Sequence, residues 1–222
     1  MVTVKDHIRS ILYFEGIAED ELAYVAENSL MRTFTAGEMI FLEGEPADGL
    51  WIVEKGNVKV FKLNPEGGEH ILHLCGPGRT FNDIAALDGG SNPANAAALS
   101  PEAHVWQVPS AVLTYVLTQN TQVALNVIRL LAMRVRSLVG QIEDLALYSV
   151  MVRLARFLLK QAEDPSLSGP GVTRTAIAAH INTTPQTISN VLRSLEEIGA
   201  IQFDRHRIVI VNENLLRSIA ML

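Results

Sequence analysis

Residues 173–200 read TRTAIAAHINTTPQTISNVLRSLEEIGA, and this stretch decides the C-terminal fold. Thr173 can cap a first helix, because its hydroxyl can accept a backbone N–H of the first turn. Asn182 tolerates the left-handed backbone that a tight turn needs. Thr184 can cap a second helix, and Pro185 suits the first helical position because the N–H that it lacks would have no partner there. The stretch therefore predicts two short helices joined by a tight turn.

The second helix has one apolar face and one polar face. Its apolar residues recur at steps of three and four and are Ile188, Val191, Leu192 and Leu195. Its polar residues are Gln186, Ser189, Asn190 and Arg193. Such side chains can reach base edges or phosphates when the start of a helix enters a major groove. We expect Gln186, Ser189 and Asn190 to contact bases; for this segment alone, an ordinary helical hairpin with a solvated polar face is the alternative.

A predicted β-hairpin follows the second helix. After Gly199, a helix-stop residue, the chain reads AIQFDRHRIVIV, which is two alternating strands around a polar turn. A helix-turn-helix followed by a hairpin is a winged arrangement, and arginines on the wing can meet a phosphate backbone. The residues expected to contact phosphates are Thr173, Thr175, Thr184, Arg193, Arg205 and Arg207.

The composition indicates a folded protein with two ordinary domains. The chain has 222 residues, of which 48% are hydrophobic and 19% charged. No apolar stretch approaches the roughly 20 residues of a membrane span, and the N-terminus lacks a signal-peptide pattern. The single cysteine, Cys75, excludes an internal disulfide and any multi-cysteine metal or cluster site. We therefore expect a cytoplasmic protein with no membrane partner.

The net charge of −6 is unevenly distributed. Residues 1–120 hold 7 Lys and Arg against 16 Asp and Glu, which gives −9, whereas residues 121–222 hold 11 against 8, which gives +3. The acidity thus belongs to the first half. A mildly basic second half predicts modest and salt-sensitive affinity for nonspecific DNA.

Short strands between turn residues dominate residues 34–108. Segments such as LWIVEKGNVKVFKL and HILHLC are rich in Ile, Val and Phe. This pattern predicts an antiparallel β-roll or barrel. Before it, residues 20–30 read DELAYVAENSL and predict a helix with Asp20 as a possible cap.

A long helix with an apolar seam is predicted between the two halves. The seam has steps of 4, 3, 4, 3, 4 and 3 and consists of Ala124, Ile128, Leu131, Val135, Leu138, Ile142 and Leu145. Such a seam favours a parallel homodimer, which would present two recognition helices to an inverted-repeat operator. The alternative is a helix packed only on its own β domain, and we expect Val127, Leu130 and Val139 to pack there.

A break at Tyr148 and Ser149 separates the long helix from the next one, which Ser149 can cap. A hinge at this point would swing the DNA-binding half. The sequence thus predicts an α+β chain with an effector-sensing β-roll in residues 1–120, a dimerisation helix in residues 121–148 and a winged helix-turn-helix in residues 149–222.

This order of elements resembles the family of the cyclic-AMP receptor protein and the fumarate–nitrate reduction regulator, CRP/FNR. The similar segments are residues 37–62, GEMIFLEGEPADGLWIVEKGNVKVFK; residues 78–89, GRTFNDIAALDG; and residues 173–201, TRTAIAAHINTTPQTISNVLRSLEEIGAI. The resemblance implies a cyclic-nucleotide-binding-like roll, an effector site between the roll and the long helix, a regulator that activates or represses transcription, and RNA polymerase as a partner.

The matching effector-site positions depart from the members that bind cyclic nucleotides. Asn82 and Asp83 replace a Gly-Glu pair, and Pro93 and Ala94 replace the Arg-Ser pair that holds the cyclic phosphate. A buried phosphate would lack a charged partner here, at a cost of several kcal/mol. We therefore expect an effector other than cyclic AMP, in a pocket formed by Asn82, Asp83, Ala94, Asn95, Leu138 and Val139.

Two other mechanisms found in the family bear on the effector. Iron–sulfur members need several N-terminal cysteines, which this chain lacks. The chain is also similar to members that sense nitric oxide or carbon monoxide through haem, for which His7, His73 and Cys75 are the candidate ligands. The alternative roles are a solvent-facing His73 and a small hydrophobic Cys75. A member that needs no effector would have much the same sequence.

The reading helix departs from the family's usual Glu, Ser and Arg. Gln and Asn pair best with adenine, so Gln186 and Asn190 predict an operator richer in A·T at those positions. Two other functions were weighed. A sensory dimer whose winged domain binds protein remains an alternative. An enzyme is not expected, because the sequence contains no nucleophile–base pair, paired acids or metal-ligand cluster.

Overall fold

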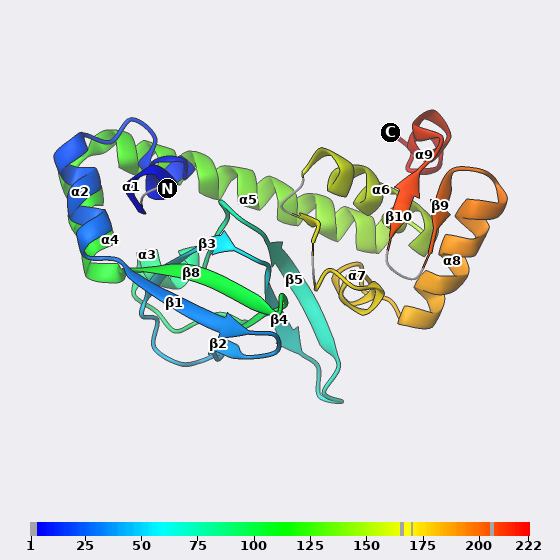
Figure 1. Ribbon diagram of the computed structural model, residues 1–222, viewed down its shortest axis with the longest axis horizontal. Coiled ribbons are helices and arrows are strands. Elements are labelled where there is room, and N and C mark those ends of the chain that lie inside the picture. Colours follow the sequence, from blue (N-terminus) through cyan, green and yellow to red (C-terminus); the bar gives the residue numbers. More distant parts are fainter. Residues whose placement is uncertain (1–3, 165–166, 170, 205–206) are drawn as a thin grey trace.

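The computed structural model describes residues 4–164, 167–169, 171–204 and 207–222. Its order is helices, a β-roll, a long helix and a second helical unit that carries a small hairpin (Figure 1). Three short helical segments open the chain: α1 (Val4–Arg9), the 3-10 turn η1 (Leu12–Phe14) and α2 (Glu19–Glu27). Asp20 does not cap α2, because the helix already begins at Glu19 and the cap position falls on Ala18.

Two four-stranded antiparallel sheets form the roll, as the sequence predicts. One has the order β1 (Leu30–Thr35), β8 (Glu102–Pro109), β3 (Gly49–Lys55) and β6 (Thr80–Phe81). The other has the order β2 (Met39–Phe41), β7 (Asn95–Ala98), β4 (Val58–Leu63) and β5 (Glu69–Cys75). The short helix α3 (Asp83–Asp88) follows β6, and α4 (Ser110–Gln119) leads from β8 to the long helix.

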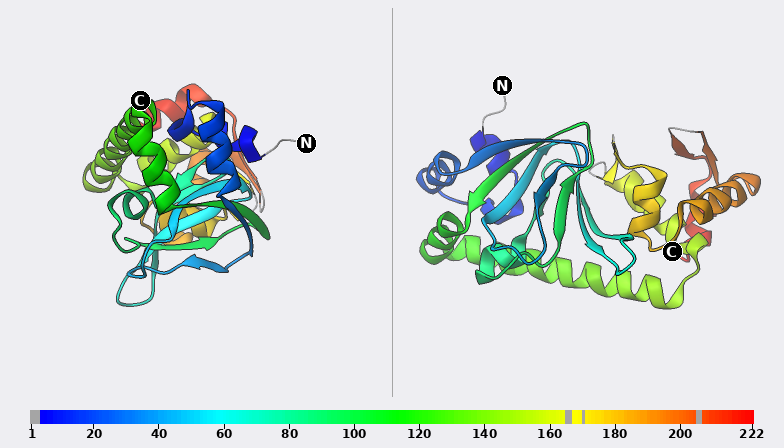
Figure 2. Two further views of the ribbon diagram at one scale, coloured as in Figure 1. Left: turned by 90° about the vertical axis from the view of Figure 1, so that its left-hand side faces the viewer. Right: turned by 90° about the horizontal axis from the view of Figure 1, so that it is seen from below.

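The long helix α5 (Thr121–Leu147) runs along one edge of the molecule. Asn120 caps it, with its side-chain oxygen accepting from the backbone N of Gln122 at 2.9 Å and of Val123 at 3.2 Å. Figure 2 shows the roll and the C-terminal helices on the same side of α5, and no helix or strand of the described residues covers its other side. The helix is therefore packed on one face and open on the other.

The packed face of α5 is a stripe that starts at Val123 and continues through Val127, Leu130 and Arg134. The first two are buried, and Leu130 packs against the same apolar cluster as Tyr13 and Phe14. Val139, which was expected to join this stripe, is 58% exposed. Each residue turns a helix by about 100°, so Val139 lies close to the opposite side from the stripe.

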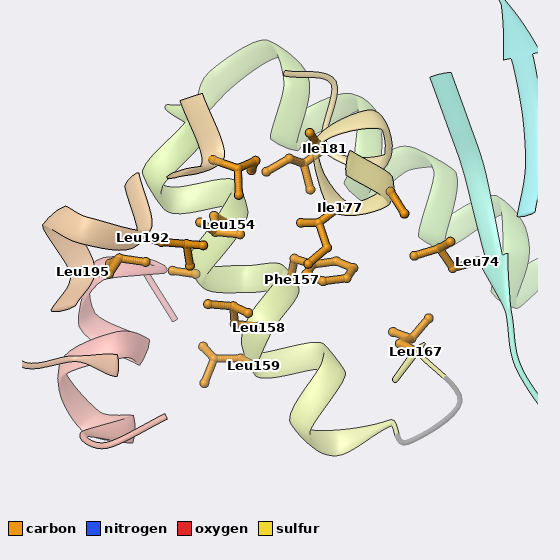
Figure 3. Close-up of a cluster of buried hydrophobic side chains, with 14 of the residues drawn as sticks. Leu74, Leu154, Phe157, Leu158, Leu159, Leu167, Ile177, Ile181, Leu192 and Leu195 are labelled. Carbon is orange, nitrogen blue, oxygen red and sulfur yellow. The ribbon is translucent and has the colours of Figure 1, made fainter. Parts of the chain in front are cut away.

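The C-terminal unit consists of α6 (Val150–Glu163), α7 (Arg174–His180), α8 (Pro185–Glu197), β9 (Ile201–Phe203), β10 (Ile208–Ile210) and α9 (Glu213–Ile219). Ser149 caps α6 by accepting from the backbone N of Val152 at 3.5 Å. The core of the unit gathers Leu154 and Phe157 of α6 around side chains of α7 and α8 (Figure 3). Among the described residues, no helix is both long and apolar enough to cross a membrane.

The C-terminal unit is docked on the roll through α7 and β5. Ile71 and Leu74 of β5 belong to the same buried cluster as Ile177 of α7, and Figure 3 shows Leu74 facing this core from its strand. His70 Nδ1 lies 3.2 Å from the carbonyl oxygen of Ala179, and His180 Nδ1 lies 3.2 Å from that of Ile71. Each half thus hydrogen-bonds the backbone of the other.

A close backbone approach completes this docking. Gly171 has φ +97°, and a Cβ there would lie 2.4 Å from the carbonyl oxygen of Leu99 in the roll. Only glycine fits such a position without a shift of backbone. The sequence therefore supports the docked arrangement at a second point, where Leu99 packs beside the α7–β5 contact.

Candidate DNA-reading helix and effector pocket

The local signals in residues 173–200 form the predicted helix-turn-helix. Thr173 Oγ1 accepts from the backbone N of Ala176 at 3.2 Å, and Thr184 Oγ1 accepts from that of Thr187 at 3.2 Å. Asn182 has φ +54°, the left-handed conformation that the turn needs. Pro185 is the first residue of α8. These caps fix where α8 begins and which of its faces is free.

The free face of α8 carries a connected polar strip. Gln186 Nε2 donates to Asn190 Oδ1 at 3.3 Å, and Arg193 Nη1 donates to the same oxygen at 3.3 Å. All three side chains are exposed. Ser189 lies beside them, and its hydroxyl donates to the backbone oxygen of Pro185 at 3.0 Å, so it can still accept. The opposite face is anchored in the core by Ile188, Leu192 and Leu195, all fully buried.

The wing stands next to the first turn of α7. Arg174 Nη2 donates to the carbonyl oxygen of Asp204 at 2.5 Å, and its guanidinium lies 5.0 Å from the centre of the Phe203 ring. This positioning role of Arg174 was not foreseen, although its place directly after the cap Thr173 was visible in the sequence. Arg207 is exposed on the wing, whereas Arg205 lies outside the described residues.

The expected phosphate-contacting threonines differ in how free they are. Thr175 is exposed and has no side-chain role in capping. Thr173 and Thr184 are also exposed, but each already accepts a backbone N–H as a cap. A hydroxyl that accepts in this way can still donate, so both can meet a phosphate oxygen.

Asp83 of the expected effector pocket is already paired with residues of the chain. Its Oδ1 accepts from the Tyr13 hydroxyl at 2.7 Å and from the Thr80 hydroxyl at 2.9 Å. Arg134 of α5 lies 2.6 Å from its Oδ2 and also donates to the Thr80 carbonyl oxygen at 2.7 Å. Burial and the neighbouring Asp83 raise the pKa of Tyr13, which keeps it a hydrogen-bond donor. This network joins the N-terminal segment, the roll and α5.

The inside of the roll beside this network is filled with aromatic rings. Phe41, Trp51 and Phe81 pack together with ring centres 6.0–6.3 Å apart. Asn82 has φ +65° and donates from Nδ2 to Asn92 Oδ1 at 2.9 Å. The surroundings of the expected pocket are thus apolar rings and amides.

The structure brings together only some of the expected pocket residues. Asn82, Asp83, Ala94 and Asn95 are all buried in the roll, and Asn95 Oδ1 accepts from the backbone N of Glu43 at 3.0 Å. Leu138 and Val139 instead lie on an exposed face of α5. In the single chain they do not join the other four.

Two of the three candidate haem ligands lie together, and the third does not line their cavity. His73 and Cys75 of β5 line one cavity of about 340 Å³, together with Arg134. Burial and Arg134 lower the pKa of His73 to about 4, and burial raises the pKa of the Cys75 thiol to about 12. His7 is elsewhere, with Nε2 3.1 Å from the carbonyl oxygen of Val53. Within the described part of the chain, no three His, Cys, Asp or Glu residues gather as a metal site.

Most of the apolar seam of α5 faces away from the rest of the chain. Five of its members are exposed, namely Ile128, Val135, Leu138, Ile142 and Leu145. Ala124 and Leu131 are half-buried. A regular row of large apolar side chains in water is typical of an interaction surface.

Both halves of the chain match models of known families. Residues 31–120 match the cyclic nucleotide-binding domain, and residues 152–219 match the Crp-like helix-turn-helix domain. The cyclic AMP receptor protein of Thermus thermophilus is 28% identical over 210 residues, which cover 93% of this chain and 95% of the relative. The global nitrogen regulator of Synechococcus elongatus is 28% identical over 188 residues, with 81% and 84% covered.

Solved structures show the same architecture. The structure of FixK2 from Bradyrhizobium japonicum has a TM-score of 0.78 at 25% identity and covers 86% of this chain and 96% of that one. A CRP-family transcriptional regulator from Thermus thermophilus has a TM-score of 0.70 at 27% identity, with 86% and 97% covered. The β-roll, the long helix and the helix-turn-helix therefore occur here in the order and arrangement of these regulators. The chain belongs to the CRP/FNR family of DNA-binding transcription regulators.

Proposed function

We propose that this protein is a homodimeric, sequence-specific transcription regulator that reads an inverted-repeat operator with α8. The observation that carries the proposal is the polar strip of Gln186, Asn190 and Arg193, held outward by a helix whose other face is fully buried. A rigid helix that presents amide groups in its first two turns and a guanidinium in the next turn suits the major groove. Arg207 and Thr175 stand where phosphate contacts would fix its position.

The seam of α5 supports the dimer. Parallel pairing of two copies would bury the exposed row that includes Ile128, Val135 and Ile142. It would also give the two α8 helices a twofold relation, so that half-sites about one helical turn apart are expected. In this proposal residues 1–120 sense, residues 121–148 dimerise and residues 149–222 read DNA and present the protein to RNA polymerase.

A salt-dependent mobility-shift titration tests the proposal. Affinity for an operator must fall as salt rises, because each phosphate contact releases counterions. Gln186→Ala and Asn190→Ala should weaken specific binding, whereas Gln119→Ala, on the exposed end of α4, should leave it unchanged. If DNA binding changes neither with salt nor with Gln186→Ala or Asn190→Ala, the proposal fails and a protein target for the winged domain is favoured.

The effector is proposed to be something other than cyclic AMP. Ala94 has no side-chain donor and no charge for a phosphate, and Asp83 is already bound by Tyr13, Thr80 and Arg134. A buried phosphate would therefore remain without a charged partner. Titration calorimetry with cyclic AMP should show no saturable heat of binding. The affinity of the protein for its operator should be the same with and without the nucleotide.

A second proposal for this site is that the protein needs no effector, and the same network supports it. The network already ties the roll to α5 without any ligand. In that case the bare recombinant protein binds its operator fully. A large increase in operator affinity on adding a host-cell metabolite extract would contradict it.

Haem-based gas sensing has one observation in its favour. His73 and Cys75 line a shared cavity with the cation Arg134, which would have to leave Asp83 to meet a propionate. The absorption spectrum of the protein purified from its own host decides this function. A Soret band lost in His73→Ala would support it, and a protein with full DNA binding and no such band would exclude it.

A further inference from the structure

A small cavity lies where four elements of the two halves meet. It has a volume of about 110 Å³ and is bounded by β5, the C-terminal end of α5, α6 and the end of α7. Figure 1 shows these elements converging at the junction of the roll and the C-terminal unit. The cavity is separate from the expected effector pocket, because Asn82, Asp83, Ala94 and Asn95 do not line it.

Positive side chains of α6 dominate its wall. Arg153, Arg156 and Lys160 all line the cavity, and among its described lining residues Asp144 is the sole carboxylate. Arg156 forms an ion pair with that carboxylate, with Nη1 2.6 Å from Asp144 Oδ1. Its Nε donates to the carbonyl oxygen of Ala220 at 2.8 Å. The other two cations therefore face the cavity without a carboxylate.

Arg153 and Lys160 are short of partners. Unlike Arg156, neither has a carboxylate oxygen of a described residue within 4.0 Å. Within the described chain, the Arg153 Nε is a buried donor with no hydrogen-bond acceptor. A charged donor buried in this way is costly, so it points to an acceptor that the chain itself does not provide.

Two histidines, one from each half of the chain, complete the wall of the cavity. His70 of β5 and His180 of α7 use Nδ1 to contact backbone carbonyl oxygens at 3.2 Å, so each Nδ1 carries a proton. Burial and the nearby Lys160 lower the pKa of His180 to about 4, which is consistent with a positive potential at this place. Three cations of α6 thus face one carboxylate, Asp144 of α5, and this excess of positive charge favours an anion.

The size of the cavity restricts the ligand. Water occupies about 30 Å³ in the liquid, so the space is that of roughly three or four waters. A tetrahedral phosphate or a carboxylate group fits such a volume, either as a free ion or as the end of a larger molecule. We propose that this cavity is a binding site for a small oxyanion, held by Arg153 and Lys160 at the junction of the sensing and reading halves.

Such an anion would join elements that belong to different halves. Arg153 and Lys160 come from the reading unit, and His70 comes from the roll. A bound oxyanion neutralises the cations of α6 and so stabilises the docked arrangement of α7 on β5. The site responds to free phosphate or to the phosphate or carboxylate end of a larger molecule.

Calorimetric titration of the full-length protein with inorganic phosphate, at constant ionic strength in chloride, tests the proposal. We expect one phosphate per chain and a binding constant about ten to a hundred times weaker in Arg153→Gln and in Lys160→Gln, since each removes a charge-assisted hydrogen bond. Lys55→Gln serves as control, because Lys55 is an exposed cation that is paired with Glu102 and does not line the cavity. Lys160 is exposed, so its variant should fold. Repetition with acetate and with a phosphorylated sugar separates the possible sources of the anion.

Two results would overturn the site. One is the absence of saturable phosphate binding in the wild-type protein. The other is binding that is equal in the wild type, the two cavity variants and Lys55→Gln, because that pattern belongs to general salt effects. Thermal unfolding in phosphate against chloride gives a second readout: only the wild type and Lys55→Gln should gain stability.

Discussion

Truncation of Ile142 on the α5 seam should separate the proposed dimer. Ile142 is 66% exposed in the single chain, and pairing would remove most of this surface from water. Full burial of such a side chain stabilises by about 1.5–3 kcal/mol, so two-thirds of it amounts to about 1–2 kcal/mol per chain. Both copies of Ile142 are buried in the dimer, so their combined contribution to the free energy of association is about 2–4 kcal/mol. Ile142→Ala should therefore weaken dimerisation by about 30- to 1,000-fold.

Sedimentation equilibrium over a range of protein concentrations measures this change directly. Ile84→Ala is the matched control, because Ile84 on α3 is 57% exposed but does not lie on the seam. Equal dissociation constants for the wild type and Ile142→Ala would refute the assignment of this surface. So would a loss of dimer in Ile84→Ala of the same size.

Three further predictions concern the pocket, the docking and the reader. Tyr13→Phe should lower the free energy of unfolding in urea by about 1–3 kcal/mol, because it leaves buried Asp83 without one donor. Burial holds the pKa of His180 at about 4 against its usual 6.5, so only the unfolded chain is protonated there as pH falls from 6.5 to 4. Wild-type stability should fall over this window by up to about 3 kcal/mol more than that of His180→Gln, as measured by denaturation at each pH. Arg193→Ala should weaken binding to all DNA sequences and reduce the salt slope by about 1, whereas Gln186→Ala should relax base preference, as competition binding would show.

Local sequence signals were sufficient to predict the helices of the helix-turn-helix. The caps at Thr173, Thr184 and Ser149 and the left-handed Asn182 occur as the sequence predicts, because each depends on a few neighbouring residues. The heptad spacing likewise predicts the long helix α5. Helix phase was harder to judge at one place: Val139 was assigned to the packed face, yet it lies beside the seam and is exposed.

Contacts between distant segments could not be predicted. The Tyr13–Asp83 hydrogen bond joins residues 70 positions apart, and His70 and His180 each contact a carbonyl 109 positions away. No periodicity encodes such pairs, because they depend on how the roll, α5 and the reading unit meet. Arg134 offered one usable signal: it continues the packed stripe of Val127 and Leu130, where a cation needs a buried partner.

Selection of binding sites from random duplex DNA tests the central claim most directly. The wild-type protein should enrich an inverted repeat whose half-sites are centred about one helical turn apart, with A·T pairs favoured where Gln186 and Asn190 make contact. Gln186→Glu should shift the preference at one position of each half-site toward a C·G pair, since Glu accepts from cytosine. Enrichment of no sequence, of a single unrepeated site, or of the same site by both proteins would contradict the proposal that paired α8 helices read the operator.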